Sequence, residues 1–231
     1  MAKVPRKVLV PLGWLGFVGA LSGLVWARYA QDPTPEPRGQ LVFEDAFERG
    51  EVGGDYLPAK ADQGWEAGTW IIENGRLKGQ GIHNATLWLQ KPLPEKVRIE
   101  VDVRAEGDKG DLKVEAFGDG RMHQSGYIFI YGGWSNKIIT LAHNDEHSED
   151  RKVDNRPCAQ PGGKTQCVVP GLDYHWTIER TDDTVRWYVD GALMLTYPYH
   201  PSGVPEHFGF GNWESPTTFD NLKIYDLAGT P

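Results

Sequence analysis

The densest cluster of polar side chains in this 231-residue chain is the segment 143–147, His-Asn-Asp-Glu-His. Histidine titrates near neutral pH and burial can raise the pKa of a carboxyl group, so Glu146 and His147 could act as an acid and a base. If the segment is a strand, His143, Asp145 and His147 share one face, with about 6.6 Å between neighbours. Two of these side chains could then hold a zinc ion, but three could not without a bend. The remaining interpretation is a solvated polar loop.

Aromatic side chains are the second group that could bind a ligand, since the chain has 9 Trp, 9 Tyr and 8 Phe. Flat rings with apolar faces pack against the CH-rich surfaces of sugars. Trp134 follows two glycines and Trp213 lies between two polar residues, so both are expected at strand ends with polar neighbours. Trp176 and Trp187 alternate in phase with apolar neighbours and are assigned to the core. The predicted substrate-binding residues are Tyr127, Trp134, Asn136, His143 and Trp213.

The elements that must position these residues are strands. From residue 41 onward apolar residues recur at every second position, Gly, Asp, Pro and Asn clusters interrupt them, and helical periodicity is almost absent. The run 97–103 alternates Val or Ile with charged residues, and 176–178 and 185–189 flank a short turn and predict a hairpin. Further strands are expected at 41–44, 69–72, 76–78, 86–89, 112–117, 126–131, 137–143, 193–197, 207–212 and 219–225. Short strands with one apolar face each bury those faces best as a two-sheet antiparallel jelly-roll sandwich.

Residues 1–30 are predicted to be a signal peptide or an N-terminal membrane anchor that forms a hydrophobic helix. Positions 8–27 carry no charge and follow Lys3, Arg6 and Lys7. About twenty residues match a hydrocarbon core of about 30 Å, which favours a retained anchor, whereas Val25-Trp26-Ala27 could serve as a cleavage site. Both interpretations place the rest of the chain outside the cytoplasm, because the positive flank stays inside. Residues 31–40 are Pro-rich and polar and are expected to form a linker.

The two cysteines, Cys158 and Cys167, enclose a Pro-Gly-Gly turn. In an oxidising compartment they can close a short loop, so a disulfide is predicted. The competing interpretation, a metal-binding pair, lacks the four clustered ligands of a structural zinc site.

The charge of the chain is unevenly distributed. Residues 1–38 hold five Lys and Arg against two Asp and Glu, and the remaining residues hold 19 against 30. An acidic body repels phosphate backbones, so no nucleic-acid partner is expected. The sequence also has no phosphate-binding loop and no G-x-S-x-G elbow, which excludes nucleotide-dependent and serine-hydrolase chemistry.

Four segments resemble the concanavalin A-like lectin/glucanase superfamily, both in their sequences and in the order in which they follow one another. They are 68–81, 96–105, 174–194 and 219–227. The resemblance spans 41–227. Within that superfamily, 131–136, 141–147 and 210–221 are similar to secreted bacterial DUF1961/YesU-type, LamG-like jelly-roll proteins, which are associated with plant-polysaccharide use. The resemblance implies a concanavalin A-like sandwich with a concave, sugar-binding face.

The resemblance also implies two kinds of acidic site. Several glucanases of the superfamily carry E-x-D-x-E or E-x-D-x-x-E on one strand of the concave sheet, whereas Glu100, Asp102 and Glu106 have one intervening residue too many. A polar face with cross-strand ion pairs is therefore the preferred interpretation of that strand. Similar sandwiches tie the first strand to the last through a structural calcium ion, and the matching residues here are Asp45 and Asp220. Alternatively, Asp220 only bonds backbone amides in a turn.

These features predict an exported domain, 41–227, that binds a polysaccharide or oligosaccharide through a concave face. A first alternative is a glycoside hydrolase or polysaccharide lyase on the same fold, with Glu146 and His147 as its catalytic residues. A second is a non-catalytic envelope interaction or scaffold protein. Residues 8–27 would tether the domain to the membrane if they are not removed.

Overall fold

The computed structural model describes residues 39–61, 64–158 and 165–228. The predicted N-terminal helix, with its anchor or signal segment 8–27, and most of the predicted linker lie outside these residues. Within the described ranges, no helix is long and apolar enough to cross a membrane.

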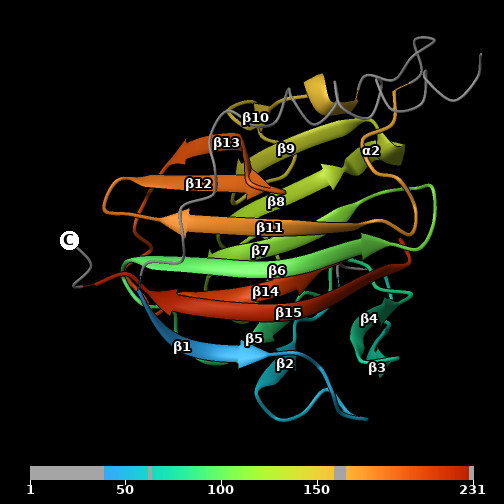
Figure 1. Cartoon of the computed structure of the whole chain (residues 1–231), viewed down its shortest axis with the longest axis horizontal. Coiled ribbons are helices and arrows are strands. Elements are labelled where there is room, and N and C mark those ends of the chain that lie inside the picture. Colours follow the sequence, from blue (N-terminus) through green and yellow to red (C-terminus); the bar gives the residue numbers. More distant parts are fainter. Residues whose placement is uncertain (1–38, 62–63, 159–164, 229–231) are drawn as a thin grey trace, which may run out of the picture.

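The described chain folds into two antiparallel sheets that lie one behind the other (Figure 1). Sheet A has the order β13 (Ala192–Pro198), β12 (Thr184–Val189), β11 (Asp173–Arg180), β6 (Val97–Ala105), β15 (Thr217–Asp226), β4 (Arg76–Gln80) and β3 (Thr69–Glu73), and β1 (Gln40–Asp45) also pairs with β15. Sheet B has the order β10 (Lys152–Val153), β9 (Ile138–His143), β8 (Tyr127–Gly132), β7 (Leu112–Gly118), β14 (His207–Gly211), β5 (Leu87–Leu89) and β2 (Tyr56–Pro58). Two short helical turns, α2 (Gly133–Asn136) and η1 (Arg156–Cys158), complete the elements.

The predicted all-β, two-sheet antiparallel sandwich is confirmed. β11 and β12 form the expected hairpin, in which Trp176 faces Val189 and Ile178 faces Trp187. The turn from β12 to β13 uses Asp190 and Gly191, both with positive φ, which suits a tight turn between twisted strands. Among the described strands, β2 and β10 were not predicted; they have three and two residues, too few for a clear alternating pattern.

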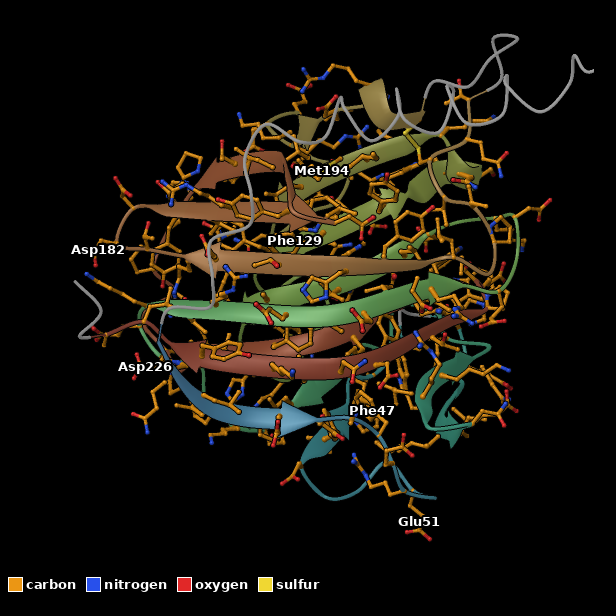
Figure 2. The ribbon with its side chains drawn as sticks, viewed as in Figure 1. Phe47, Glu51, Phe129, Asp182, Met194 and Asp226 are labelled. Carbon is orange, nitrogen blue, oxygen red and sulfur yellow. A yellow bond between two sulfur atoms is a disulfide. The ribbon has the colours of Figure 1, made fainter. Side chains whose placement is uncertain are left out.

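The core lies between the two sheets because alternate residues of every long strand point inward. Trp176 and Trp187 are fully buried with ring centroids 4.7 Å apart, and Phe129 packs edge-on against Trp187 from sheet B. Figure 2 shows Phe129 and Phe47 among the strands and the charged Asp182 and Glu51 on the outside. Burial of such rings supplies the main favourable term for the sandwich.

The predicted disulfide between Cys158 and Cys167 is present, and both residues are buried. It closes a loop that returns the chain to α2, where Asn136 Oδ1 accepts hydrogen bonds from the backbone amides of Cys167 and Val168 at 3.0 and 2.7 Å. The cross-link therefore fixes the chain next to the end of β8.

Candidate functional site

The outer face of sheet B carries a row of charged residues along β7. Leu112, Val114 and Ala116 belong to the core, so the alternation of the strand places Asp111, Lys113 and Glu115 on the opposite face. β7 lies in the middle of sheet B, between β8 and β14. The strand β14 presents glycines there, and a Cβ built on Gly211 would lie 2.8 Å from Lys113 Cγ. Glycine at that position makes room for the Lys113 side chain to cross β14.

Loops around this row enclose a cleft with a volume of about 580 Å³. Its lining residues come from the ends of several strands and from the loops that follow them: Asn84, Lys109, Asp111, Lys113, Gln124, Ile130, Trp134, Ser135, Glu146, His147, Trp213 and Glu214. The rigid sheet forms the floor, and the connecting segments form the walls. This arrangement is typical of binding sites, in which a scaffold positions functional loops.

Lys113 and Glu146 form a buried ion pair at the floor of the cleft. Lys113 Nζ lies 2.9 Å from Glu146 Oε2 and 3.1 Å from Asn84 Oδ1, and only 2% of the Lys113 side chain is exposed. Burial opposes the ionisation of Glu146, but the charge and hydrogen bond of Lys113 outweigh it and hold the pKa of Glu146 below its ordinary value. Burial likewise opposes the charge on Lys113, yet Asp111 and Glu146 together raise its pKa. Both partners are therefore ionised near neutral pH.

Asp111 lies in the same cleft in a different electrostatic environment. Its carboxylate accepts a hydrogen bond from the backbone of Trp213, but its Oδ2 atom is shielded from solvent and has no hydrogen-bond partner among the described residues. Burial raises the pKa of Asp111, and the neighbouring Glu146 adds to this while Lys113 opposes it. The two carboxyl groups of the floor thus have pKa values shifted in opposite directions.

Glu115 holds one wall of the cleft in place rather than lining it. The residue is fully buried, and its carboxylate accepts hydrogen bonds from Thr86 Oγ1 and, at 2.9 Å, from the backbone amide of Gln124. His123 Nδ1 lies 2.6 Å from Glu115 Oε1. These contacts fix the loop 119–126, whose Gln124 faces the cleft.

Aromatic groups border the cleft at the ends of the strands on either side of β7. Trp134 follows β8 in α2, where it adopts a positive φ of 49°, and 39% of the residue is exposed. Its ring lies edge-on to His147, with centroids 5.4 Å apart, and beneath the guanidinium of Arg151 at 5.1 Å. This side of the cleft therefore combines an apolar ring face with polar and charged groups.

The second aromatic group follows β14. Trp213 lies edge-on to both His83 and Trp65, with centroid distances of 5.3 Å, and Trp65 stacks on His83 at 4.3 Å. Glu214 Oε1 lies 2.9 Å from His83 Nε2, which fixes the His83 ring. The group exposes half of Trp65 to solvent.

The structure brings four of the sequence-predicted site residues together in the cleft, Trp134, Glu146, His147 and Trp213. Tyr127 and His143 are elsewhere: Tyr127 is part of the core, and the His143 ring lies 4.6 Å from it. Asn136 is buried, and its amide donates to the carbonyls of Val168 and Asp108 while its oxygen holds the disulfide loop. These three residues shape the scaffold around the cleft.

The acidic strand considered in the sequence, β6, lies in sheet A and not in the sheet that carries the cleft. Its charged residues form the expected ion pairs: Arg98 binds Glu100 on its own strand at 2.7 Å and Glu179 on β11 at 2.9 Å. Asp102 Oδ1 lies 2.7 Å from His175 Nδ1. The structure bears out cross-strand ion pairs on β6, but the expected solvated face is wrong at Arg98 and Glu100, which are buried because Arg98 pairs with both Glu100 and Glu179.

The predicted calcium ligands are engaged by other groups. Both carboxylate oxygens of Asp45 accept hydrogen bonds, from Arg49 at 2.5 and 2.7 Å and from Tyr56 at 2.7 Å. Asp220 accepts a hydrogen bond from the backbone amide of Asn221 and lies 3.5 Å from Arg76. A calcium ion at Asp45 would have to displace Arg49, and the described residues contain no cluster of three or more His, Cys, Asp or Glu suited to a metal. These donors do not fit a calcium ion as they stand, and calcium stays a prediction.

Sequence reasoning missed Asp111, Lys113, Asn84 and Gln124. The signal for the first two was present, since 111–116 alternates charged and apolar residues in the same way as 97–103. Local alternation shows that a strand has a polar face, but it does not show which of the two sheets contains the strand.

No protein-family model and no curated protein sequence matches the chain. Solved structures match its fold. The laminarinase from Flavobacterium sp. UMI-01 has a TM-score of 0.56 and 16% identity over 81% of this chain and 100% of that chain. The carbohydrate binding module CBM66 from Bacillus subtilis has a TM-score of 0.54 and 14% identity over 76% and 98%. The endo-β-galactosidase from Clostridium perfringens that releases GlcNAcα1-4Gal has a TM-score of 0.55 and 11% identity over 88% and 66%.

The chain therefore has the concanavalin A-like lectin/glucanase fold. Glycanases and carbohydrate-binding modules share this fold, and identities this low concern the fold alone. The narrower similarity to DUF1961/YesU-type proteins stays a prediction.

Proposed function

We propose that residues 41–227 form a carbohydrate-binding domain that holds a polysaccharide in the cleft over β7. The observation that carries this proposal is the pairing of Trp134 and Trp213 at the borders of a cleft whose floor is polar. Indole faces pack against sugar rings, while polar groups of the cleft such as Asn84, Asp111 and Gln124 can exchange hydrogen bonds with sugar hydroxyls. A fold common to glycanases and carbohydrate-binding modules agrees with this ligand class.

We also propose that the domain works outside the cytoplasm. The buried disulfide between Cys158 and Cys167 supports this location, because such bonds persist in oxidising compartments. The acidic balance of residues 39–231 agrees with a partner other than nucleic acid.

A glycoside hydrolase is the second candidate function, and one observation favours it. Asp111 and Glu146 lie in one cleft with pKa values displaced in opposite directions, which is the pattern of an acid paired with an ionised carboxylate. In hydrolysis, Asp111 would protonate the glycosidic oxygen as its bond to the anomeric carbon breaks. Glu146 would take a proton from the water that forms the new bond to that carbon.

Native electrophoresis of the purified protein through gels that contain single polysaccharides tests both functions. Retardation without clearing of the gel supports binding, and clearing beneath the band supports hydrolysis. The variants Trp134→Ala and Trp213→Ala should lose most of the retardation, by about tenfold or more in affinity for each ring. Leu193→Ala, which truncates an exposed apolar side chain on β13 of sheet A, is the matched control. Unchanged mobility in every gel would reject the carbohydrate proposal and direct the search to a protein partner.

A further inference from the structure

We infer that the cleft selects glycans that carry no carboxylate or sulfate, because its buried cation is already paired, and that Asp111 forms a hydrogen bond with a sugar hydroxyl. The inference rests on the proposed binding function and names the class of ligand for the same site. It depends on how the charges around the cleft are already paired.

The buried cation of the floor is not available to an anionic ligand. Lys113 directs its ammonium group to Glu146 and Asn84, and 2% of its side chain is exposed. An anionic sugar that reached Lys113 would have to break the contact with Glu146 and leave that carboxylate buried without its partner.

The other cations near the cleft are engaged by neighbouring acidic, aromatic or backbone groups. Lys109 Nζ lies 4.0 Å from Glu214 Oε2 on the solvent-exposed border. Arg151 lies over the ring of Trp134 and donates a hydrogen bond from Nη1 to the backbone oxygen of Glu146 at 2.9 Å. His147 Nε2 lies 3.7 Å from Glu146 Oε1, so its protonated form would also have a carboxylate as its neighbour. Among the described lining residues, each Lys and His thus has an acidic neighbour.

Asp111 is the group left without a full set of partners. Its Oδ2 atom is shielded from solvent and makes no hydrogen bond to the part of the chain that the structure describes. A shielded polar atom without a partner is unfavourable, so a ligand that supplies a donor gains affinity there. A sugar hydroxyl fits either protonation state, because it donates to the carboxylate and accepts from the carboxylic acid.

A ligand carboxylate or sulfate meets a like charge in the cleft, because Lys113 holds Glu146 in its ionised form. Like charges at short distance in a shielded site repel. The net negative charge of the domain adds to this repulsion of anionic ligands, since residues 39–231 hold 19 Lys and Arg against 30 Asp and Glu. Acidic polysaccharides are therefore rejected both at long range and at the floor.

Affinity electrophoresis at pH 7.5 tests the inference with neutral and acidic probes. The neutral probes are laminarin, xyloglucan, galactan and hydroxyethyl cellulose, and the acidic probes are carboxymethyl cellulose, polygalacturonate and alginate. We expect retardation by at least one neutral probe and by none of the acidic probes. We expect Asp111→Asn to weaken binding of the neutral probe about tenfold, because the hydrogen bond between Asp111 and the sugar hydroxyl is altered.

Asp182→Asn is the matched control, since it makes the same substitution in an exposed turn between β11 and β12. Circular dichroism and thermal unfolding of each variant verify that it is folded, and if Asp111→Asn does not fold, Asp111→Ser takes its place. Tight binding of an acidic probe by the unchanged protein would overturn the inference, as would Asp111→Asn binding the neutral probe with unchanged affinity. If no probe is retarded at all, the proposed binding function itself fails, which is a different outcome from either of these.

Discussion

Lys113 on the central strand β7 lies 2.9 Å from Glu146, a residue of the loop that follows β9, and both side chains are buried. The pair connects the floor of the cleft to the segment that carries His147. A buried pair is costly to break from one side, because the remaining charge keeps its desolvation penalty and loses its partner.

Lys113→Met should therefore lower the free energy of unfolding by about 3–5 kcal/mol. Replacing both partners, as in Lys113→Met with Glu146→Leu, should cost much less than the sum of the single changes, because no buried charge is left unpaired. Urea denaturation followed by tryptophan fluorescence measures these values. Lys96→Met, which breaks an exposed ion pair with Asp182, should leave the midpoint unchanged. Equal midpoints for Lys113→Met and the unchanged protein would contradict the assignment of a stabilising pair.

The pH dependence of stability should separate the two carboxyl groups of the floor. Burial opposes ionisation of Glu146, but Lys113 outweighs it, so the pKa of Glu146 in the folded protein lies below 4.5. The stability that Glu146 contributes is therefore present above pH 4.5 and is lost as the pH falls through the folded pKa. Burial first, and then Glu146, place the pKa of Asp111 above 3.8. Its contribution is present below pH 3.8 and is lost as the pH rises through the folded pKa.

Melting temperatures recorded between pH 3 and pH 8 test the opposite pH dependences expected for Glu146 and Asp111. Relative to the unchanged protein, Glu146→Gln should flatten the fall in stability on the acidic side. Asp111→Asn should gain relative stability as the pH rises above 3.8. Difference curves that are flat for both variants would show that neither group has a displaced pKa.

Gly211→Ala should disturb the cleft from the neighbouring strand. The added Cβ would lie 2.8 Å from Lys113 Cγ, so the buried lysine side chain would have to shift away from its contacts with Glu146 and Asn84. We expect a loss of about 1–3 kcal/mol in unfolding free energy, together with weaker glycan binding. Gly54→Ala is the control, since a Cβ added at Gly54 would have no neighbouring atom within 4 Å and its φ is not positive. Equal stability of Gly211→Ala and Gly54→Ala would show that the Lys113 side chain does not need the space that the missing Cβ of Gly211 leaves.

Removal of the disulfide should weaken both stability and ligand binding. The double change Cys158→Ser with Cys167→Ser opens a loop with a sequence separation of 9, which corresponds to about 2–3 kcal/mol in the chain-entropy account. Because Asn136 joins this loop to α2, the position of Trp134 should become less fixed. Urea denaturation and affinity electrophoresis of the double variant measure the two effects. An unchanged affinity would show that the disulfide loop does not position Trp134.

The fold could be predicted from the sequence because its signals are local. Most strands from β3 to β9 alternate or pair within a short stretch of chain, β5 being the exception, and the hairpin of β11 and β12 spans one turn. Trp134 and Trp213 were identified as border residues because polar neighbours follow the end of a strand. The structure places them in one cleft because β8 and β14 lie on either side of β7.

The floor of the site could not be predicted in the same way, because it depends on pairings between distant segments. β6 and β7 have similar charged faces, and their sheets differ only because β6 pairs with β11 and β15 whereas β7 pairs with β8 and β14. Tyr127 shares the core face with Phe129 and Tyr131. The sequence of β8 is apolar on both faces, so alternation alone does not show which face points into the core.

The last strand of the domain, β15, lies inside sheet A, where it pairs with β6, β4 and β1. The first strand, β1, has no other partner in its sheet among the described residues, and β4 and β3 join the rest of the sheet only through β15. During synthesis the earlier strands therefore leave the ribosome before the strand that unites them, and the sheet is completed only by pairings at large sequence separation. Such late closure keeps the nascent chain incompletely folded until its last strand is available.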